Sequence, residues 1–250
     1  MEYIQTDRQV IFAQQHFEMN RKFTNKMRYV MDNWVPRFIR DSYWFMWPFY
    51  YLAYGGKNIQ EVMHFKKNVH QWSKDELKEF YSRLNSISRN RDTDISENTI
   101  PEIMKICSSN TQSVLDAGCG KGYLLNLLAK NNPGKELYGL DFVDANPGIK
   151  QYTYIQGEVT NLPFNDDSID TVICAHTIEH IIDLKKAIEE LKRVARHTLI
   201  IVTPRQKYFY YTLDEHVNFF PTIEPLLSLI NEPGIDYRLI DGDWFLVIRF

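Results

Sequence analysis

A glycine-rich turn is the first stretch whose residue types and spacing could do chemistry. VLDAGCGKGYL places Asp116, Gly118, Gly120 and Gly122 two residues apart, directly after an apolar run. Glycine lets the backbone approach a ligand closely and adopt dihedral angles closed to other residues. The spacing fits neither the dinucleotide pattern G-x-G-x-x-G nor the phosphate-binding pattern G-x-x-x-x-G-K-[ST]. An acid two residues ahead of the first glycine instead suits a ligand that bears an amine and no pyrophosphate.

Two further stretches bring histidines and acids together, and histidine can accept the proton of a hydroxyl group near neutral pH. AHTIEH contains His176 and His180, and DEHVNFF contains Asp214 and His216. We expect His180 to be the general base and Asp214 or His216 to form the opposite wall of the site. Two structural alternatives stay open, namely that His180 only begins a helix and that His216 packs in the core.

The elements that must position these residues follow a regular alternation after residue 111. Short apolar runs predict strands at 113–118, 136–142, 152–159, 169–176 and 197–204. Helical periodicity predicts helices at 123–134, 183–196 and 222–230, and residues 237–250 predict two strands about a DGD turn. Alternating strands and helices indicate an α/β fold with a parallel sheet covered on both faces. We expect a Rossmann-like, doubly wound, mostly parallel sheet with an antiparallel C-terminal hairpin at one edge.

The first hundred residues have a different composition, rich in aromatic, Met, Gln and Asn residues with helix-like spacing. The stretch SKDELKEFYSRL has a helix start at Ser73, with Glu76 as its partner in a capping box. Residues 88–101 are polar and end at a proline, which indicates a connection between modules. We therefore expect a helical, aromatic-rich cap over residues 1–100 and a ligand-binding domain over residues 101–250.

The glycine turn also resembles motif I of the class I S-adenosylmethionine-dependent methyltransferases. Further stretches resemble that family in the same order: LYGLDF ending strand two, then residues 155–181 and residues 191–204. The resemblance extends from residue 112 to about 205 and hardly touches residues 1–100. It implies that S-adenosylmethionine is the cofactor.

The resemblance further implies a role for individual residues. Asp141 accepts both ribose hydroxyls, Phe142 lies against the adenine, Glu158 accepts from the adenine amino group, and the Val159 backbone lies beside it. His176 sits beside the cofactor and offers mainly its backbone. The turn leaves room for the methionine end of the cofactor, with these residues around it: Asp116, Ala117, Gly118, Cys119 and Gly120.

The composition limits the classes of binding partner and the cellular compartment that we expect. The formal net charge is −3; residues 1–100 carry 15 basic and 12 acidic side chains, whereas residues 101–250 carry 14 and 20. Because no concentrated basic face is indicated, we expect no nucleic-acid partner. The three cysteines are scattered, with no Cys/His cluster at zinc spacing, so we expect no metal site, no disulfide and a reducing compartment. No signal peptide or transmembrane segment is apparent, and a cytoplasmic protein is the default.

An unusual density of aromatic residues runs through residues 34–56, most of it within 43–54. Three interpretations compete. The aromatics can pack on the sheet domain or on a second subunit, they can form a lid that binds the substrate, or they can anchor the protein peripherally at a membrane surface.

The function predicted is methyl transfer from S-adenosylmethionine to a small-molecule or glycan acceptor, by O-methylation with a histidine base. No N-P-P-[YFW]-like tetrapeptide follows strand four, where AHTI stands instead, and this disfavours nucleobase and glutamine acceptors. The alternative is a non-catalytic S-adenosylmethionine-binding subunit whose cap serves a partner protein. A reductase that uses a nicotinamide cofactor ranks third.

Overall fold

The computed structural model describes residues 21–84, 92–108, 111–144 and 151–250. Its centre is a seven-stranded sheet of order β3-β2-β1-β4-β5-β7-β6. The strands are β1 (Ser113–Ala117), β2 (Glu136–Asp141), β3 (Thr153–Gln156), β4 (Ile169–Ala175), β5 (Ala195–Pro204), β6 (Asp236–Ile240) and β7 (Asp243–Arg249). Strands β1 to β5 are parallel, whereas β7 runs antiparallel between β5 and β6. The predicted fold class and hairpin are therefore confirmed.

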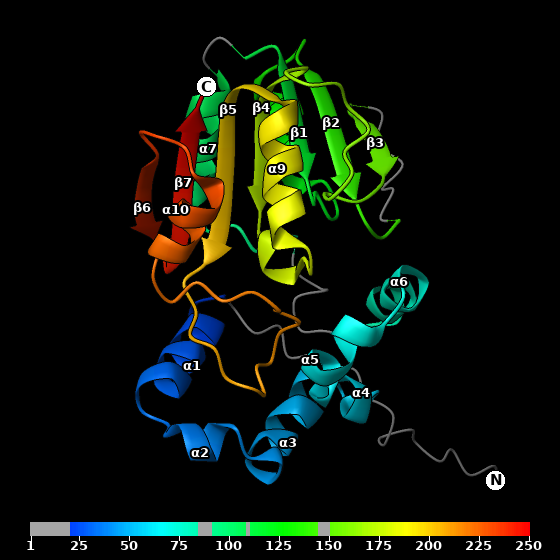
Figure 1. Ribbon diagram of the computed structural model, residues 1–250, viewed down its shortest axis with the longest axis vertical. Helices are drawn as coiled ribbons and strands as arrows, with labels where there is room; N and C mark the ends of the chain where they lie inside the picture. The colour runs from blue at the N-terminus through cyan, green and yellow to red at the C-terminus, as the bar shows by residue number, and fades with distance from the viewer. Residues whose placement is uncertain (1–20, 85–91, 109–110, 145–150) are drawn as a thin grey trace, which may run out of the picture.

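Helices cover both faces of the sheet (Figure 1). Helices α9 (Leu184–Val194) and α10 (Glu224–Ile230) cover one face, and α7 (Thr99–Ser108) and α8 (Tyr123–Asn131) cover the other. Alternate strand residues enter the two cores, because successive side chains of a strand point to opposite faces. Along β5, for example, Ile201 packs beneath α9 and α10, whereas Ile200 packs beneath α7 and α8.

Helix α7 was not predicted, and part of the 88–101 connection is helical instead. The helix begins at Thr99, so Pro101 lies in its first turn, where a missing backbone N–H costs nothing. The Ser96 hydroxyl accepts from the Thr99 N–H at 3.1 Å and supports this start. Residues 88–91 of the predicted connection lie outside the described residues.

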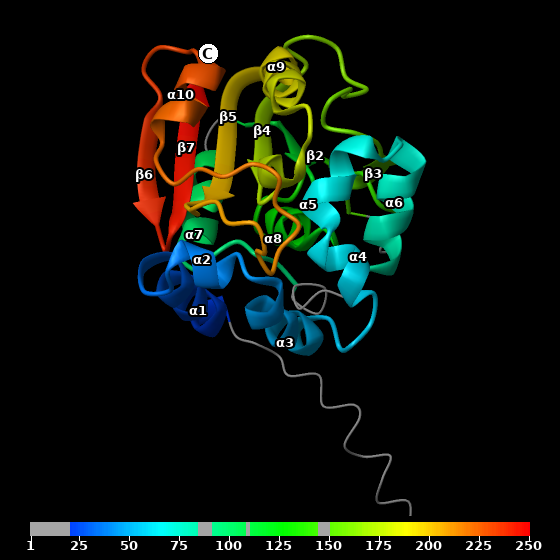
Figure 2. The same cartoon turned by 60° about the horizontal axis from the view of Figure 1, so that its bottom comes forward.

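The helices of residues 21–84 form a cap with its own core of buried apolar side chains. They are α1 (Arg21–Asn33), α2 (Arg37–Arg40), α3 (Tyr43–Ala53), α4 (Ile59–Met63), α5 (Phe65–Asn68), η2 (Val69–Gln71) and α6 (Lys74–Arg83). Figures 1 and 2 show them at the carboxyl ends of the parallel strands. The predicted capping box is present, since Ser73 and Glu76 exchange backbone-to-side-chain hydrogen bonds of 2.7 and 3.3 Å.

The chain after β5 leaves the sheet and enters this cap. Phe209 is buried in the cap core, and the Tyr50 hydroxyl of α3 donates to the Thr212 carbonyl. The Tyr54 hydroxyl donates to the Glu215 carboxylate at 2.6 Å. The buried face of α3 thus holds the segment that carries Asp214, Glu215 and His216. Within the described residues, no helix combines the length and apolar character needed to cross a membrane.

Arg193 at the end of α9 is expected to matter most for the stability of the sheet domain. Its guanidinium binds both Glu190 carboxylate oxygens at 2.8 Å and donates to the carbonyls of Leu162 and Phe164 at 3.0 and 2.7 Å. Arg193→Ala removes two hydrogen bonds from the buried Glu190 carboxylate and leaves it the Lys186 ammonium at 3.6 Å, so we expect the free energy of unfolding to fall by about 3 kcal/mol. Lys185→Ala, which removes an exposed ion pair on the same helix, is the control and should change it by less than about 0.5 kcal/mol. Urea denaturation measures both; equal effects would contradict the prediction.

Candidate functional site

A cavity of about 640 Å³ lies at the carboxyl ends of β1, β2 and β4. Strand order reverses between β1 and β4, and ligands of open α/β sheets bind at that point. The cavity is closed on the cap side by Lys74, Leu77 and Tyr81 of α6 and by residues 92–95. Of the predicted cofactor residues, the following line it: Asp116, Gly118, Cys119, Gly120, Asp141, Phe142, Glu158, Val159 and His176. Ala117 is fully buried in the core and is not among the lining residues.

The three glycines of the turn do different work. Each has a positive φ, of 91°, 52° and 72° at Gly118, Gly120 and Gly122. A Cβ at Gly118 would meet Thr177 Oγ1 at 2.1 Å, and one at Gly122 would meet Tyr152 Oη at 1.9 Å, whereas one at Gly120 would meet nothing within 4 Å. Protein side chains therefore occupy the space beside Gly118 and Gly122, whereas the space beside Gly120 is open.

The backbone of the turn is bound to the end of β2. The N–H groups of Gly118 and Cys119 both donate to the Leu140 carbonyl, at 2.7 and 3.0 Å. The Gly120 N–H donates to Asp141 Oδ2 at 2.7 Å, and the other oxygen, Oδ1, accepts from the Val143 N–H at 3.0 Å. These hydrogen bonds hold the bend rigid, and the Asp141 carboxylate keeps further lone pairs for a ligand.

Two carboxyl groups meet beneath the turn. Burial, together with the nearby Asp141, raises the pKa of Asp116 to about 7. Burial also raises the pKa of Asp141, although the N–H groups of Gly120 and Val143 oppose that effect. A cationic group in the cavity would relieve the repulsion between the two acids, which suits the amine-bearing ligand expected from the sequence.

At the other end of the cavity, Glu158 follows β3 and faces the cap. Its Oε2 forms an ion pair of 2.7 Å with Lys74 Nζ of α6 and accepts from the Thr160 hydroxyl at 3.2 Å. Val159 and Phe142 complete this wall. Sequence reasoning missed Lys74, whose position near Glu158 depends on how the cap meets the sheet.

His176 closes the cavity beside β4 with a positive φ of 52°. Its Nε2 lies 3.2 Å from Asp243 Oδ2, and its Nδ1 lies 3.4 Å from Glu179 Oε1. Burial alone would lower the pKa of His176, but the two carboxylates raise it to about 10. The protonated ring joins the ends of β4 and β7, which leaves it a structural role in the wall.

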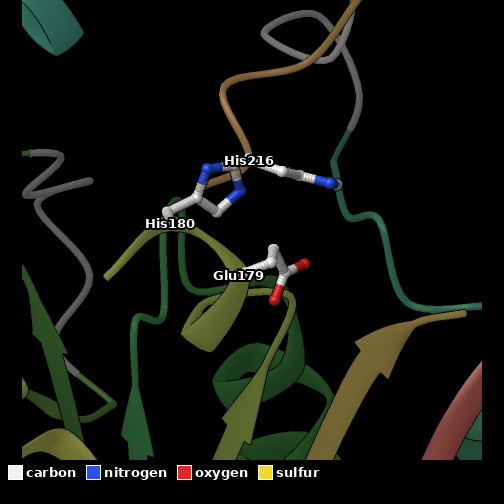
Figure 3. A group of neighbouring side chains, drawn as sticks. All are labelled: Glu179, His180 and His216. Atoms are coloured by element: carbon white, nitrogen blue, oxygen red, sulfur yellow. The ribbon is translucent and has the colours of Figure 1, made fainter. Parts of the chain in front are cut away.

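Glu179, His180 and His216 form a cluster whose metal-ligating atoms all lie within 4.8 Å of one another. Figure 3 shows the two imidazoles side by side above the Glu179 carboxylate; their ring centroids are 4.8 Å apart. His180 lines the cavity, whereas His216 and Asp214 lie behind it, outside the lining residues. The predicted base is thus on the cavity wall, and the two residues expected opposite it are on the same side.

Hydrogen bonds determine the tautomers of both imidazoles. His180 Nδ1 lies 3.0 Å from the Glu215 carbonyl oxygen, which can only accept, so this nitrogen carries the proton. Gln206 Nε2 donates to Asp214 at 2.8 Å, which turns the amide oxygen toward His216 Nδ1 at 2.6 Å. His216 Nδ1 is therefore a donor too. In the neutral form of each ring, Nε2 therefore keeps its lone pair.

The acidic and imidazole groups of the cluster differ in the direction of their pKa shifts. Burial lowers the pKa of His216 to about 4, so that ring is neutral. Burial would raise the pKa of Asp214, but the Lys66 ammonium and the hydrogen bond from Gln206 help to lower it to about 2. Burial would likewise raise the pKa of Glu179, but His176 holds it below its usual value. Two carboxylates, Asp214 and Glu179, are therefore ionised near the neutral His216 imidazole.

The aromatic run divides between the two faces of α3. Met46, Tyr50 and Tyr54 face inward, and no residue of 34–56 lines the cavity. Trp44 is 82% exposed, and its neighbours on the outer face include Tyr51 and Leu52. The inner face supports the site loop through Tyr50 and Tyr54, a role that the sequence pattern did not separate from ordinary core packing.

Comparisons with known proteins agree with this site. Residues 115–202 match the family described as "Methyltransferase domain". The chain is 32% identical over 136 residues to a protein of Mycolicibacterium smegmatis named "Probable S-adenosylmethionine-dependent methyltransferase", which covers 50% of this chain and 52% of that protein. It is 30% identical over 146 residues to the demethylmenaquinone methyltransferase of Thermotoga maritima, and this match covers 54% of this chain and 62% of that protein. The chain thus spans about half the length of the curated relatives it matches.

A solved structure agrees at the level of the fold. An S-adenosyl-L-methionine-dependent methyltransferase from Methanococcus maripaludis superimposes with a TM-score of 0.51 at 17% identity, covering 73% of this chain and 92% of that chain. The glycine turn, the two acids beneath it and the family match lead to one assignment. Residues 115–202 thus carry a methyltransferase domain similar to those of the S-adenosylmethionine-dependent methyltransferases, a family whose cofactor is S-adenosyl-L-methionine.

Proposed function

We propose that the protein is an enzyme that transfers a methyl group from S-adenosylmethionine to a hydroxyl group of a small-molecule or glycan acceptor. The observation that carries this proposal is the position of His180, which lines the same cavity that contains the glycine turn. Cofactor and acceptor can therefore meet in one cavity.

The cavity residues fit the cofactor. Gly120 opens onto free space, and Asp141 is held by two backbone N–H groups with lone pairs left for the ribose hydroxyls. Asp116 would face the amino group of the methionine end, and Glu158 and Phe142 the adenine end. When bound, the cofactor supplies a methyl group already activated by the sulfonium, so transfer depends mainly on alignment.

The residues of the chain supply that alignment and the proton acceptor. In the proposed reaction, His180 Nε2 accepts the proton of the acceptor hydroxyl while the hydroxyl oxygen attacks the methyl group. The Glu215 carbonyl holds the imidazole in the required tautomer. Leu77 and Tyr81 of the cap, together with Ile182 of the sheet domain, give the cavity an apolar surface that suits the apolar part of an acceptor.

Alternatives of other classes make different predictions. A non-catalytic subunit would bind S-adenosylhomocysteine and transfer no methyl group, and a nicotinamide-dependent reductase would bind NAD instead. The exposed outer face of α3 supports a peripheral or self-association role for the cap, and we propose a cytoplasmic location.

The test combines binding and turnover. We expect calorimetry to show binding of S-adenosylmethionine and S-adenosylhomocysteine and none of NAD. A methyl-labelled donor incubated with small-molecule and glycan extracts should yield a labelled product that resists acid treatment, as ethers do. Cofactor binding with no transfer to any fraction would favour the binding subunit.

Cofactor affinity is expected to depend on pH through Asp116. Burial, together with the nearby Asp141, raises the pKa of Asp116 to about 7, so the carboxyl is protonated below that pH. The neutral carboxyl cannot form an ion pair with the ammonium group of the ligand. We expect S-adenosylhomocysteine affinity to fall up to about tenfold per pH unit below 7 and to be level well above it. The same shift lowers the stability of the free protein as pH rises from about 4 to 7, because the folded state retains the proton longer.

Calorimetry between pH 5.5 and 8.5, in buffers of different ionisation enthalpy, measures the affinity and the proton released on binding. Asp116→Asn is the control and should bind weakly with a flat pH profile. A profile of wild-type steepness in that variant would show that another group is responsible.

A further inference from the structure

The cluster of Glu179, His180 and His216 has features that the proposed base alone does not explain. The two imidazoles use their Nδ1 atoms to hydrogen-bond Glu215 and Gln206, and within the described residues neither Nε2 atom has a hydrogen-bond partner. Glu179 is 1% exposed and its Oε1 accepts no hydrogen bond within the described residues, its nearest charged neighbour being His176 Nδ1 at 3.4 Å. Two imidazoles and one buried carboxylate therefore converge, with Thr203 donating to one carboxylate oxygen and His176 lying beside the other.

From this arrangement we propose that Glu179, His180 and His216 bind one divalent transition-metal ion, with Zn²⁺ and Mn²⁺ as the probes of choice. Two imidazole nitrogens and one carboxylate oxygen form a ligand set that such ions accept with positions left open. The ligand atoms lie within 4.8 Å of one another, and small side-chain rotations would bring them to bond lengths of about 2.0–2.2 Å.

The surroundings of the cluster resemble those of an ordered metal site. Each histidine donates its other ring N–H to an oxygen, one to a backbone carbonyl and one to an amide, which is how metal-ligating histidines are oriented. The Thr203 hydroxyl donates to Glu179 Oε2 at 3.1 Å and fixes the carboxylate. Tyr54 of the cap binds the Glu215 carboxylate at 2.6 Å and thereby holds the residue whose carbonyl orients His180.

The position of the cluster connects this inference with the proposed function, on which it rests for the place of the acceptor. His180 lies on the cavity wall, so the open positions of the ion would face the acceptor. A hydroxyl bound there becomes more acidic and loses its proton to solvent water. Its oxygen then forms the bond to the methyl carbon, and the sulfur keeps the electron pair of the broken C–S bond. In that case His180 would hold the ion, and the Lewis acidity of the ion would make a base at this position unnecessary.

The first test is binding of the metal alone. The full-length protein is dialysed against a chelator and titrated with ZnCl₂ by calorimetry and with CoCl₂ by visible absorption. We expect one ion per chain and tetrahedral or five-coordinate cobalt bands that zinc displaces. Glu179→Gln, His180→Gln and His216→Gln should each weaken zinc binding at least about 100-fold. His197→Gln removes an exposed imidazole on β5 and should leave zinc binding unchanged.

Each variant is assessed by its affinity for S-adenosylhomocysteine, which shows that it has folded. Failure of the wild-type protein to bind zinc, or wild-type zinc affinity in any folded ligand variant, overturns the metal site. Methyl transfer that persists after chelation also overturns its role while leaving the proposed function in place. Zinc binding without any methyl transfer would uphold the site and contradict the proposed function.

Discussion

Gly118→Ala is expected to weaken cofactor binding at least tenfold and to lower the free energy of unfolding by about 3 kcal/mol. The new Cβ would stand 2.1 Å from Thr177 Oγ1, and the backbone φ of 91° is unfavourable for any side chain. Thr177 belongs to the loop that begins with His176, so the strain would spread from the glycine turn to the other wall of the cavity. Calorimetry with S-adenosylhomocysteine and urea denaturation measure the two effects.

Gly120→Ala is the matched control because it changes the same turn in the same way. Its Cβ meets no atom within 4 Å and its φ of 52° is tolerated by other residues at about 1–2 kcal/mol. We expect this variant to keep most of its stability and to lose cofactor affinity, since Gly120 lines the cavity. The double variant Gly118→Ala, Thr177→Gly should recover part of the stability. Equal unfolding free energies for the two single variants would contradict the assignment of separate roles.

His180→Ala is expected to lower methyl transfer by roughly two to four orders of magnitude while changing S-adenosylhomocysteine affinity by less than about threefold. The imidazole lines the cavity, and within the described residues its ring hydrogen bond is to the Glu215 carbonyl. Single-turnover kinetics with a labelled donor would measure the loss. A rate within threefold of wild type would remove His180 from the chemistry altogether.

Both roles considered for His180, base or metal ligand, predict this loss. Chelation of the wild-type protein separates them, because a base needs no ion. His197→Ala is the control for loss of an imidazole, and its methyl-transfer rate should equal that of wild type.

Much of the fold could be predicted from local sequence patterns. Alternation of apolar residues and helical periodicity are short-range properties, so β1, β4, α9 and the β6–β7 hairpin follow from the sequence. Helix α7 was missed because its polar start and Pro101 resemble a loop, whereas a proline in the first helical turn is harmless. The direction of β7, between β5 and β6, depends on which strands pair, and pairing is a long-range property.

The sequence by itself determined the kind of ligand site, because the spacing of Asp116, Gly118 and Gly120 is a property of one continuous turn. Only the tertiary structure decided which glycine faces the ligand, since Thr177 and Tyr152 come from other segments to fill two of the three spaces. It also decided that His216 meets Glu179 and His180. That meeting requires the chain after β5 to pass through the cap, where Tyr50 and Tyr54 hold it. Contacts of that kind depend on the packing of distant segments, which residue spacing alone does not encode.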